Sequence, residues 1–303
     1  MRCVLGDVVL GVHGDAFSYL FSYAQGGPVS LQSGGYEWAY RPPRPTFWRA
    51  TTCNDRGNGF PARSAMWMGA DLFTSVQSIA VQVDGQHLEK FTAPWNNTYR
   101  GTALENPKEV CITYTYVTPT TPETTVDVSY TVREEGSIQV RLHYRGEKSL
   151  PGLPVFGWRL VTPHAVDGYS YDGLEGETYP DRKAGARTGS FTVEGLPVTP
   201  YVVPQDCGVH MDSQRVSLHH GGHGFHVDMD NVPFAFSALP YTALELENAS
   251  HHEELPPVRR TVLCILGAVR GAGGINSWGA DVLPAYHISG EKDIILSFSV
   301  SLT

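Results

Sequence analysis

The stretch VDVSYTVREEGSIQVRLHY, residues 126–144, alternates apolar and polar side chains on both sides of a short turn. Its apolar positions are Val126, Val128, Tyr130 and Val132 in the first arm, and Ile138, Val140, Leu142 and Tyr144 in the second. Successive side chains of a β-strand point to opposite faces, so a period of two places the apolar groups of each arm on one face. The stretch therefore predicts a β-hairpin that turns at residues 133–136 and buries one face.

Other parts of the chain repeat this pattern. Residues 294–300 alternate again, which predicts a C-terminal strand that closes the sheet. Clusters of Gly, Pro, Asn and Asp separate shorter candidate strands at residues 4–10, 17–23, 112–116, 225–229 and 260–269. Helix is expected to be scarce. The best candidate is Thr242–Asn248, where Thr242 and Glu245 have the spacing of a capping box.

The composition agrees with a protein of strands and turns. The 303 residues are 41% hydrophobic and 17% charged, with 32 Gly and 21 Pro. This profile favours an all-β fold over one built on long helices. No linker or internal repeat divides the sequence, so we expect a single domain over residues 1–303.

Charge and apolar runs argue against two classes of partner. The formal net charge is −9 and Lys and Arg form no cluster, so a nucleic-acid partner is not expected. The longest apolar run, residues 262–269, is too short to cross a bilayer, so no membrane partner is expected either. The five Cys include no CxxC pair, and the N-terminal residues lack the apolar core of a signal peptide. We therefore expect reduced thiols in a cytoplasmic protein.

Four segments are rich in side chains that carry chemistry. The first, residues 46–59, has little periodicity and many hydrogen-bonding groups. One interpretation is a long, well-tethered loop in which Asn54 and Asp55 bind backbone amides and Arg49 pairs with a carboxylate. The alternative is a loop that borders a polar pocket.

The second segment, Gly173–Arg182, contains three acidic residues. Glycoside hydrolysis normally needs two carboxyl groups, and Glu175 and Glu177 would share one face of a strand. Turn chemistry is the favoured interpretation, however, because of the glycines and Pro180, with Asp181 and Arg182 forming a local ion pair.

The third segment, residues 219–230, contains four His and two Asp around three glycines. Imidazole and carboxylate groups suit a divalent metal such as zinc or nickel. The histidines fall across a Gly-rich turn, while Val227 and Met229 occupy inward strand positions. A solvated hairpin is therefore favoured, and no metal site is expected.

The fourth segment, Gly271–Asp281, places three glycines in four positions ahead of Trp278. Glycines allow unusual backbone dihedrals and close approach, and an indole face suits the apolar C–H patch of a galactose ring. Residue type alone nevertheless favours a Trp that fills the core. The chain has no nucleophile elbow, phosphate-binding loop or dinucleotide fingerprint.

Several segments together resemble one family, the small subunit of two-chain bacterial β-galactosidases, which is equivalent to the C-terminal domain of single-chain enzymes of glycoside hydrolase family 2. The matching segments run in order through nearly the whole chain. They are Pro45–Thr52 with Asn54–Asn58, Gly176–Arg182, Pro200–Tyr201 with Val203–Gln205, Pro240–Ala243 with Glu245–Ala249, and Gly273–Gly274 with Ser277–Gly279.

The resemblance implies an antiparallel galactose-mutarotase-like supersandwich that completes the active site of a TIM-barrel large subunit. The reaction would be hydrolysis of terminal β-D-galactosides such as lactose. The catalytic glutamates and the Mg and Na sites would belong to that large subunit, so this chain would carry no catalytic residue and no cofactor. The Trp that stacks on the sugar in the family matches Trp278.

The resemblance also suggests a rim to the active site. Gly27, in the turn at residues 26–30, matches the region of the family's mobile loop beside the substrate entrance. Arg49, Asn54 and Asp55 would lie near the barrel chain and position other groups. The sequence departs from the family at Cys53, where Asp is usual, and at Asn276, where the neighbour of the Trp is commonly acidic.

Two other functions stay open on the same fold. One is a stand-alone aldose epimerase that uses His164 or His210 as the acid and a Glu as the base. The other is a carbohydrate-binding or purely structural module.

Overall fold

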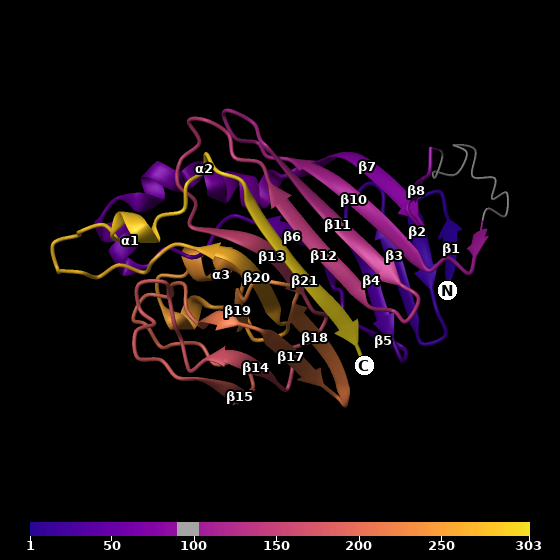
Figure 1. Ribbon diagram of the computed structural model, residues 1–303. Helices are drawn as coiled ribbons and strands as arrows, with labels where there is room; N and C mark the ends of the chain where they lie inside the picture. Colours follow the sequence, from indigo (N-terminus) through magenta and orange to yellow (C-terminus); the bar gives the residue numbers. More distant parts are fainter. Residues whose placement is uncertain (90–102) are drawn as a thin grey trace.

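The computed structural model describes residues 1–89 and 103–303, and its strands form three antiparallel sheets (Figure 1). The largest sheet has ten strands. Their order is β15 (Thr188–Glu194), β14 (Gly168–Leu174), β17 (Arg215–His220), β18 (His223–Met229), β21 (Ile294–Leu302), β12 (Ile138–Tyr144), β11 (Thr125–Arg133), β10 (Glu109–Val117), β7 (Ser75–Val83) and β8 (Gln86–His87).

The two smaller sheets have five and six strands. The five-stranded sheet has the order β16 (Val209–Ser213), β19 (Phe234–Leu239), β20 (Val262–Val269), β13 (Val155–Val161) and β6 (Arg41–Thr46). The six-stranded sheet has the order β5 (Tyr36–Glu37), β4 (Pro28–Ser33), β3 (Phe17–Ser22), β2 (Val9–His13), β1 (Arg2–Leu5) and β9 (Ala103–Glu105). The all-β, antiparallel class expected from the sequence is confirmed.

The hairpin predicted at residues 126–144 forms as β11 and β12. The register runs from Val126 opposite Tyr144 to Val132 opposite Ile138, and the apolar residues of both strands are buried. The C-terminal strand β21 also forms, but it is central: it pairs with β12 on one side and with β18 on the other. It therefore joins the two halves of the ten-stranded sheet.

The shorter strand predictions are confirmed with one correction. A single strand over residues 4–10 is wrong, because the chain turns between β1 and β2, where the Gly6 amide donates to the Val9 carbonyl at 3.0 Å. The two strands then pair with each other, with Leu5 opposite Leu10. Both strands are apolar, so the apolar pattern gave no sign of the turn between them.

Helices cover more of the chain than the sequence predicted. The expected helix is confirmed as α3 (Ala243–Asn248), with the capping box of Thr242 and Glu245. The loop predicted over residues 46–59 is wrong in its second half, which forms α1 (Cys53–Gly57), and α2 (Phe60–Phe73) follows it. Short 3₁₀ turns lie at His252–Glu254 and Pro284–Tyr286. Within residues 1–89 and 103–303, no helix combines the length and apolar character needed to cross a bilayer.

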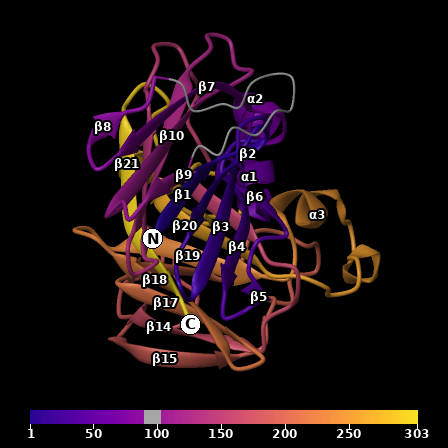
Figure 2. The ribbon, with the colours of Figure 1, turned by 90° about the vertical axis from the view of Figure 1, so that its right-hand side faces the viewer.

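Both smaller sheets face the ten-stranded sheet, and the hydrophobic core lies between them. Phe21 of β3 is 5.8 Å from Tyr130 of β11, and Trp158 of β13 is 5.4 Å from Phe298 of β21, measured between ring centroids. In Figure 2 the three α-helices lie together on the side of the molecule away from β8 and β21. The connection between β20 and β21 extends past α1 at the left of Figure 1. This connection carries the candidate site.

Candidate site on the Trp278 loop

Trp278 is almost fully exposed. Its relative accessibility is 92%, the largest among the exposed large hydrophobic side chains of the described chain. The interpretation of Trp278 as a core-filling residue is therefore wrong. An indole left in water forgoes the apolar stabilisation that burial would give, and its face is open to contact from another molecule.

The backbone around Trp278 is held by local hydrogen bonds. Oδ1 of Asn276 accepts from the Trp278 amide at 2.9 Å and from the Ala280 amide at 3.3 Å. Gly273, Gly274 and Gly279 have positive φ values of 75°, 81° and 77°, which side chains with a Cβ rarely adopt. A Cβ at Gly279 would also lie 2.7 Å from the Gly57 carbonyl oxygen of α1, so only glycine allows this close contact.

A carboxylate from the chain after β14 anchors the start of the loop. Oδ1 of Asp181 accepts from the Ala272 amide and Oδ2 from the Gly273 amide, both at 2.8 Å. Nε of Arg182 donates to the Gly273 carbonyl at 3.1 Å. The predicted ion pair between Asp181 and Arg182 is therefore wrong, because each side chain binds the glycine loop instead of its neighbour.

A buried charge network lies beneath the loop. Arg49 and Asp55, 3% and 1% exposed, form an ion pair at 3.0 Å. Arg49 also donates to the Gly271 carbonyl at 3.1 Å and lies 3.6 Å from Asp206. Arg270, the residue just before the glycines, is 3.8 Å from the other oxygen of Asp55.

The network continues to the far end of the loop. Arg270 pairs with Asp281, and its guanidinium lies 3.9 Å from the centroid of the Phe60 ring at the start of α2. Arg63 of α2 also pairs with Asp281, at 3.1 Å. Both ends of the loop are thus tied to charged side chains.

Burial and charge oppose each other in this network. Burial raises the pKa of Asp206 to about 6, while Arg49 and the hydroxyl of Tyr179 act against that rise. Burial would lower the pKa of Arg49, but Asp55 and Asp206 outweigh it and the pKa is raised. The guanidinium therefore stays charged, and its role here is structural.

The predicted rim residues divide into two groups. Asn54 joins the loop directly, because its Nδ2 donates to the Ala272 carbonyl at 3.0 Å, and Arg49 and Asp55 join it through the network above. Gly27 is separate: it is buried with φ at 69°, and a Cβ there would lie 3.2 Å from the Pro43 carbonyl oxygen. The role of each residue toward a substrate stays a prediction.

Glu175 and Glu177 do not share a strand face, contrary to the geometry considered from the sequence. Strand β14 ends at Leu174 and Gly176 turns the chain with φ at 73°. Glu175 is in a bidentate pair with Arg187 at 2.7 Å for both contacts. Glu177 accepts from the Thr199 hydroxyl and the Gly208 amide. Both carboxylates are thus used within the fold.

The histidines considered from the sequence lie in other settings. Residues 219–230 contain the end of β17, the turn and β18, so the predicted hairpin is confirmed. The described chain holds no group of three His, Cys, Asp or Glu placed to bind a metal ion. His210 is 5% exposed and stacks on Phe236, and burial lowers its pKa to about 4. It is enclosed in the core and therefore poorly placed to protonate a sugar.

Sequence reasoning missed the roles of Asp181, Arg182, Asp206, Arg270 and Asp281. Two signals were available. Arg270 and Asp281 flank the glycine loop directly in the sequence, and Asp181 and Arg182 belong to one of the segments that resembled the family. Two oppositely charged residues on either side of a Gly-rich loop are candidates for an ion pair that holds the two ends of the loop together.

Together, the fold and the site define an antiparallel β-sheet protein that presents an exposed indole on a loop anchored by buried charges. Residues 13–302 match the family model described as beta galactosidase small chain. The chain is 54% identical to a β-galactosidase small subunit of Latilactobacillus sakei, over 99% of this chain and 98% of that protein. The chain belongs to the β-galactosidase small-chain family.

Longer relatives and solved structures also match. A β-galactosidase of Halalkalibacterium halodurans is 35% identical over 99% of this chain, which spans 28% of that protein's length. A galactose 1-epimerase from Lactobacillus acidophilus aligns with a TM-score of 0.47 and 10% identity, over 97% of this chain and 94% of the other. A galactose mutarotase-like protein from Lactobacillus casei gives 0.45 and 11%, over 97% and 100%.

Proposed function

We propose that this chain completes the galactoside site of a separate β-galactosidase large subunit with a TIM barrel, and that Trp278 is the stacking platform for the galactosyl group. The substrates would be terminal β-D-galactosides such as lactose. The observation that carries the proposal is the 92% exposure of an indole on a loop whose two ends are fixed. An aromatic face held in place in this way can bind a sugar with little ordering cost.

The carboxylates around the loop indicate which chain carries the catalytic groups. Asp55 and Asp281 pair with arginines, Asp181 accepts from two backbone amides, and Asp206 accepts from the Tyr179 hydroxyl at 2.9 Å. Since each is occupied, we place the two glutamates of a retaining mechanism, and the Mg and Na ions, on the large subunit. This chain would then bind and orient the sugar without cleaving the bond.

We further propose that the chain corresponds to the C-terminal domain of single-chain enzymes of glycoside hydrolase family 2. Its match to a limited part of longer β-galactosidases supports this equivalence. The cytoplasm is the proposed compartment, because all five cysteines are free thiols.

Reconstitution with the cognate large subunit tests the platform. Trp278→Ala should lower kcat/KM for a chromogenic galactoside by about fivefold to 150-fold, the equivalent of about 1–3 kcal/mol of lost apolar contact. Val232→Ala, at another exposed hydrophobic position (72%), is the control and should leave both constants unchanged. If the Trp278→Ala complex kept the wild-type KM and kcat, the indole would not be the platform.

A further inference from the structure

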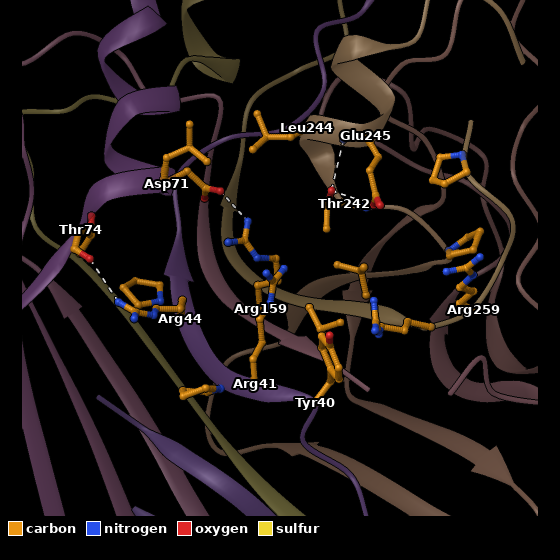
Figure 3. Close-up of a pocket in the computed structure, with 18 of the residues that line it drawn as sticks. Tyr40, Arg41, Arg44, Asp71, Thr74, Arg159, Thr242, Leu244, Glu245 and Arg259 are labelled. Carbon is orange, nitrogen blue, oxygen red and sulfur yellow. Dashed lines mark hydrogen bonds and ion pairs between the residues drawn. The ribbon is translucent and has the colours of Figure 1, made fainter. Parts of the chain in front are cut away.

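A second concave surface lies apart from the Trp278 loop. It is a cavity of about 880 Å³ between β6, the end of α2, β13 and α3, and none of its lining residues belongs to residues 270–281 (Figure 3). We call it the arginine groove. Five guanidinium groups line it, those of Arg41, Arg44, Arg159, Arg259 and Arg260. Among the described residues, the carboxylates that line it are those of Asp71 and Glu245.

Both carboxylates are already used inside the fold. Asp71 pairs with Arg159 at 2.5 Å and also accepts from the Thr46 hydroxyl and the Phe47 amide. Glu245 accepts from the Thr242 amide at 2.7 Å as part of the capping box of α3. Their negative charge therefore does not balance the remaining arginines of the groove.

Four of the arginines have no carboxylate within 4.0 Å in the described part of the chain: Arg41, Arg44, Arg259 and Arg260. Arg44 donates to the Thr74 carbonyl at 3.1 Å, so among the described residues the groove-facing charges without a hydrogen-bond or ion-pair partner are those of Arg41, Arg259 and Arg260. Arg260 lies over the Tyr40 ring at 3.5 Å, and its buried Nε has no hydrogen-bond acceptor among the described residues. Partial burial lowers the pKa of Arg41, and the charges of Arg159 and Arg260 lower it further, while Glu245 opposes them. Such a cluster of like charges is costly until an anion joins it.

The rim of the groove is apolar. Tyr40, Leu72 and Phe73 line it and are 50%, 48% and 69% exposed. Large hydrophobic side chains gathered around one depression mark an interaction site. A small oxyanion would neutralise the arginines but leave these three side chains in water. A polypeptide segment with both acidic and apolar residues would cover both.

Helix α2 links the groove to the Trp278 loop. It begins at Phe60, whose ring lies against Arg270, and ends at Phe73 on the rim of the groove. Its 14 residues span about 20 Å at 1.5 Å per residue, which one standard interface can cover. A partner that contacts Trp278 can therefore reach the groove as well.

We propose that the arginine groove is a docking surface for an acidic segment of the large subunit, whose carboxylates bind Arg41, Arg259 and Arg260 and whose apolar side chains cover Leu72 and Phe73. The inference rests on the proposed function for the identity of the partner. It adds a contact surface distinct from the sugar platform.

The test measures the dissociation constant between the full chain and the purified large subunit at low and high salt. The double variant Arg41→Glu, Arg260→Glu should raise Kd at least tenfold at low salt and flatten its dependence on salt, because the charges that attract the partner are reversed. Arg259→Glu, at an exposed position, is a second variant that should preserve the fold and also weaken binding. Arg141→Glu, Lys148→Glu makes the same change in charge at exposed positions outside the groove and should leave Kd unchanged.

The outcomes separate the two proposals. If the wild-type chain and the large subunit did not associate, the proposed function would fail. If they associated and both groove variants bound as tightly as wild type at every salt concentration, the docking surface alone would be overturned. Inorganic phosphate that raised the Tm of the wild-type chain, combined with unchanged association of the variants, would likewise overturn it and identify a site for small anions. Circular dichroism checks that each variant is folded. If the double variant does not fold, the Kd of Arg259→Glu tests the docking surface.

Discussion

At the scale of single residues, the position of Trp278 depends on side chains far away in the sequence. Asp181 holds the first turn of the loop from 91 residues away, and Arg49 reaches the same turn from 222 residues away. Each bond has a charged partner, and charge-assisted hydrogen bonds are the stronger class. The indole is thus exposed while its backbone is held in place.

Asp181→Asn tests this anchor. The amide keeps one acceptor oxygen but places an NH₂ group against a backbone N–H, so one of the two bonds is lost. We expect the free energy of unfolding to fall by about 1 kcal/mol and chymotrypsin to cleave after Trp278 severalfold faster. Asp127→Asn, a surface carboxylate paired with Arg145, serves as the control. Equal cleavage rates in Asp181→Asn and wild type would show that the carboxylate does not restrain the loop.

His210 should make the stability depend on pH. Burial lowers its folded pKa to about 4 from an ordinary 6.5, so on acidification the unfolded chain takes up a proton before the folded chain does. The stabilisation is present above pH 6.5 and is lost as the pH falls toward 4, with a full size on the order of 3 kcal/mol.

Asp206 acts in the opposite direction over part of the same range. Its folded pKa is raised to about 6, so the folded state keeps a proton that the unfolded state has lost, and stability falls as pH rises toward 6. Urea unfolding between pH 4 and pH 7 should therefore show a more negative slope of free energy against pH for His210→Gln than for wild type. An unchanged slope would mean that His210 is not the buried neutral group.

At the scale of elements, the strands were predictable and the helices only in part. Apolar and polar residues alternate with a period of two along a half-buried strand, because the backbone geometry points successive side chains to opposite faces. This pattern can be recognised in the sequence. Helix α2 buries Phe60, Ser64, Trp67, Ala70 and Asp71, which are spaced three, four and one residues apart as one helical face requires. Two of these five are polar, so the apolar stripe is weak. Asp71 is buried because the tertiary fold brings Arg159 of β13 against it.

Helix α1 depends on a cap that the sequence contains. The Thr52 hydroxyl accepts from the Asp55 amide at 3.1 Å, and the Asp55 carboxylate accepts from the Thr52 amide at 3.1 Å. Thr52→Ala should lower the free energy of unfolding by about 1 kcal/mol in urea titrations. Thr52→Ser keeps the hydroxyl and should lie close to wild type. If Ala and Ser were equally stable, the hydroxyl would not be the capping group.

At the scale of the whole molecule, β21 holds the ten-stranded sheet together. It supplies the pairing between β12 and β18, and its Phe298 packs against Trp158 of the five-stranded sheet. The last strand of the chain is therefore a central structural element, with Leu296, Phe298 and Val300 buried.

Deleting residues 294–303 should therefore abolish cooperative folding. The truncation exposes two strand edges and the core behind them, a combination that favours aggregation. Far-ultraviolet circular dichroism and size-exclusion chromatography measure the outcome. A truncated chain that stayed monomeric and melted cooperatively would contradict the central role of β21.

The sequence by itself determined the all-β class, the hairpin at residues 126–144, the capped helix at Thr242 and the resemblance that singled out Trp278. The class, the hairpin and the helix depend on periodicity and spacing, which act over a few neighbouring residues, whereas the resemblance depends on matching segments that run in order along the chain. Only the tertiary structure decided that Trp278 is exposed, that Asp181 binds the glycine loop instead of Arg182, and that the arginines of the groove lie together. Those outcomes depend on which distant segments meet, because a charged side chain takes the partner that packing brings nearest and not the one beside it in sequence.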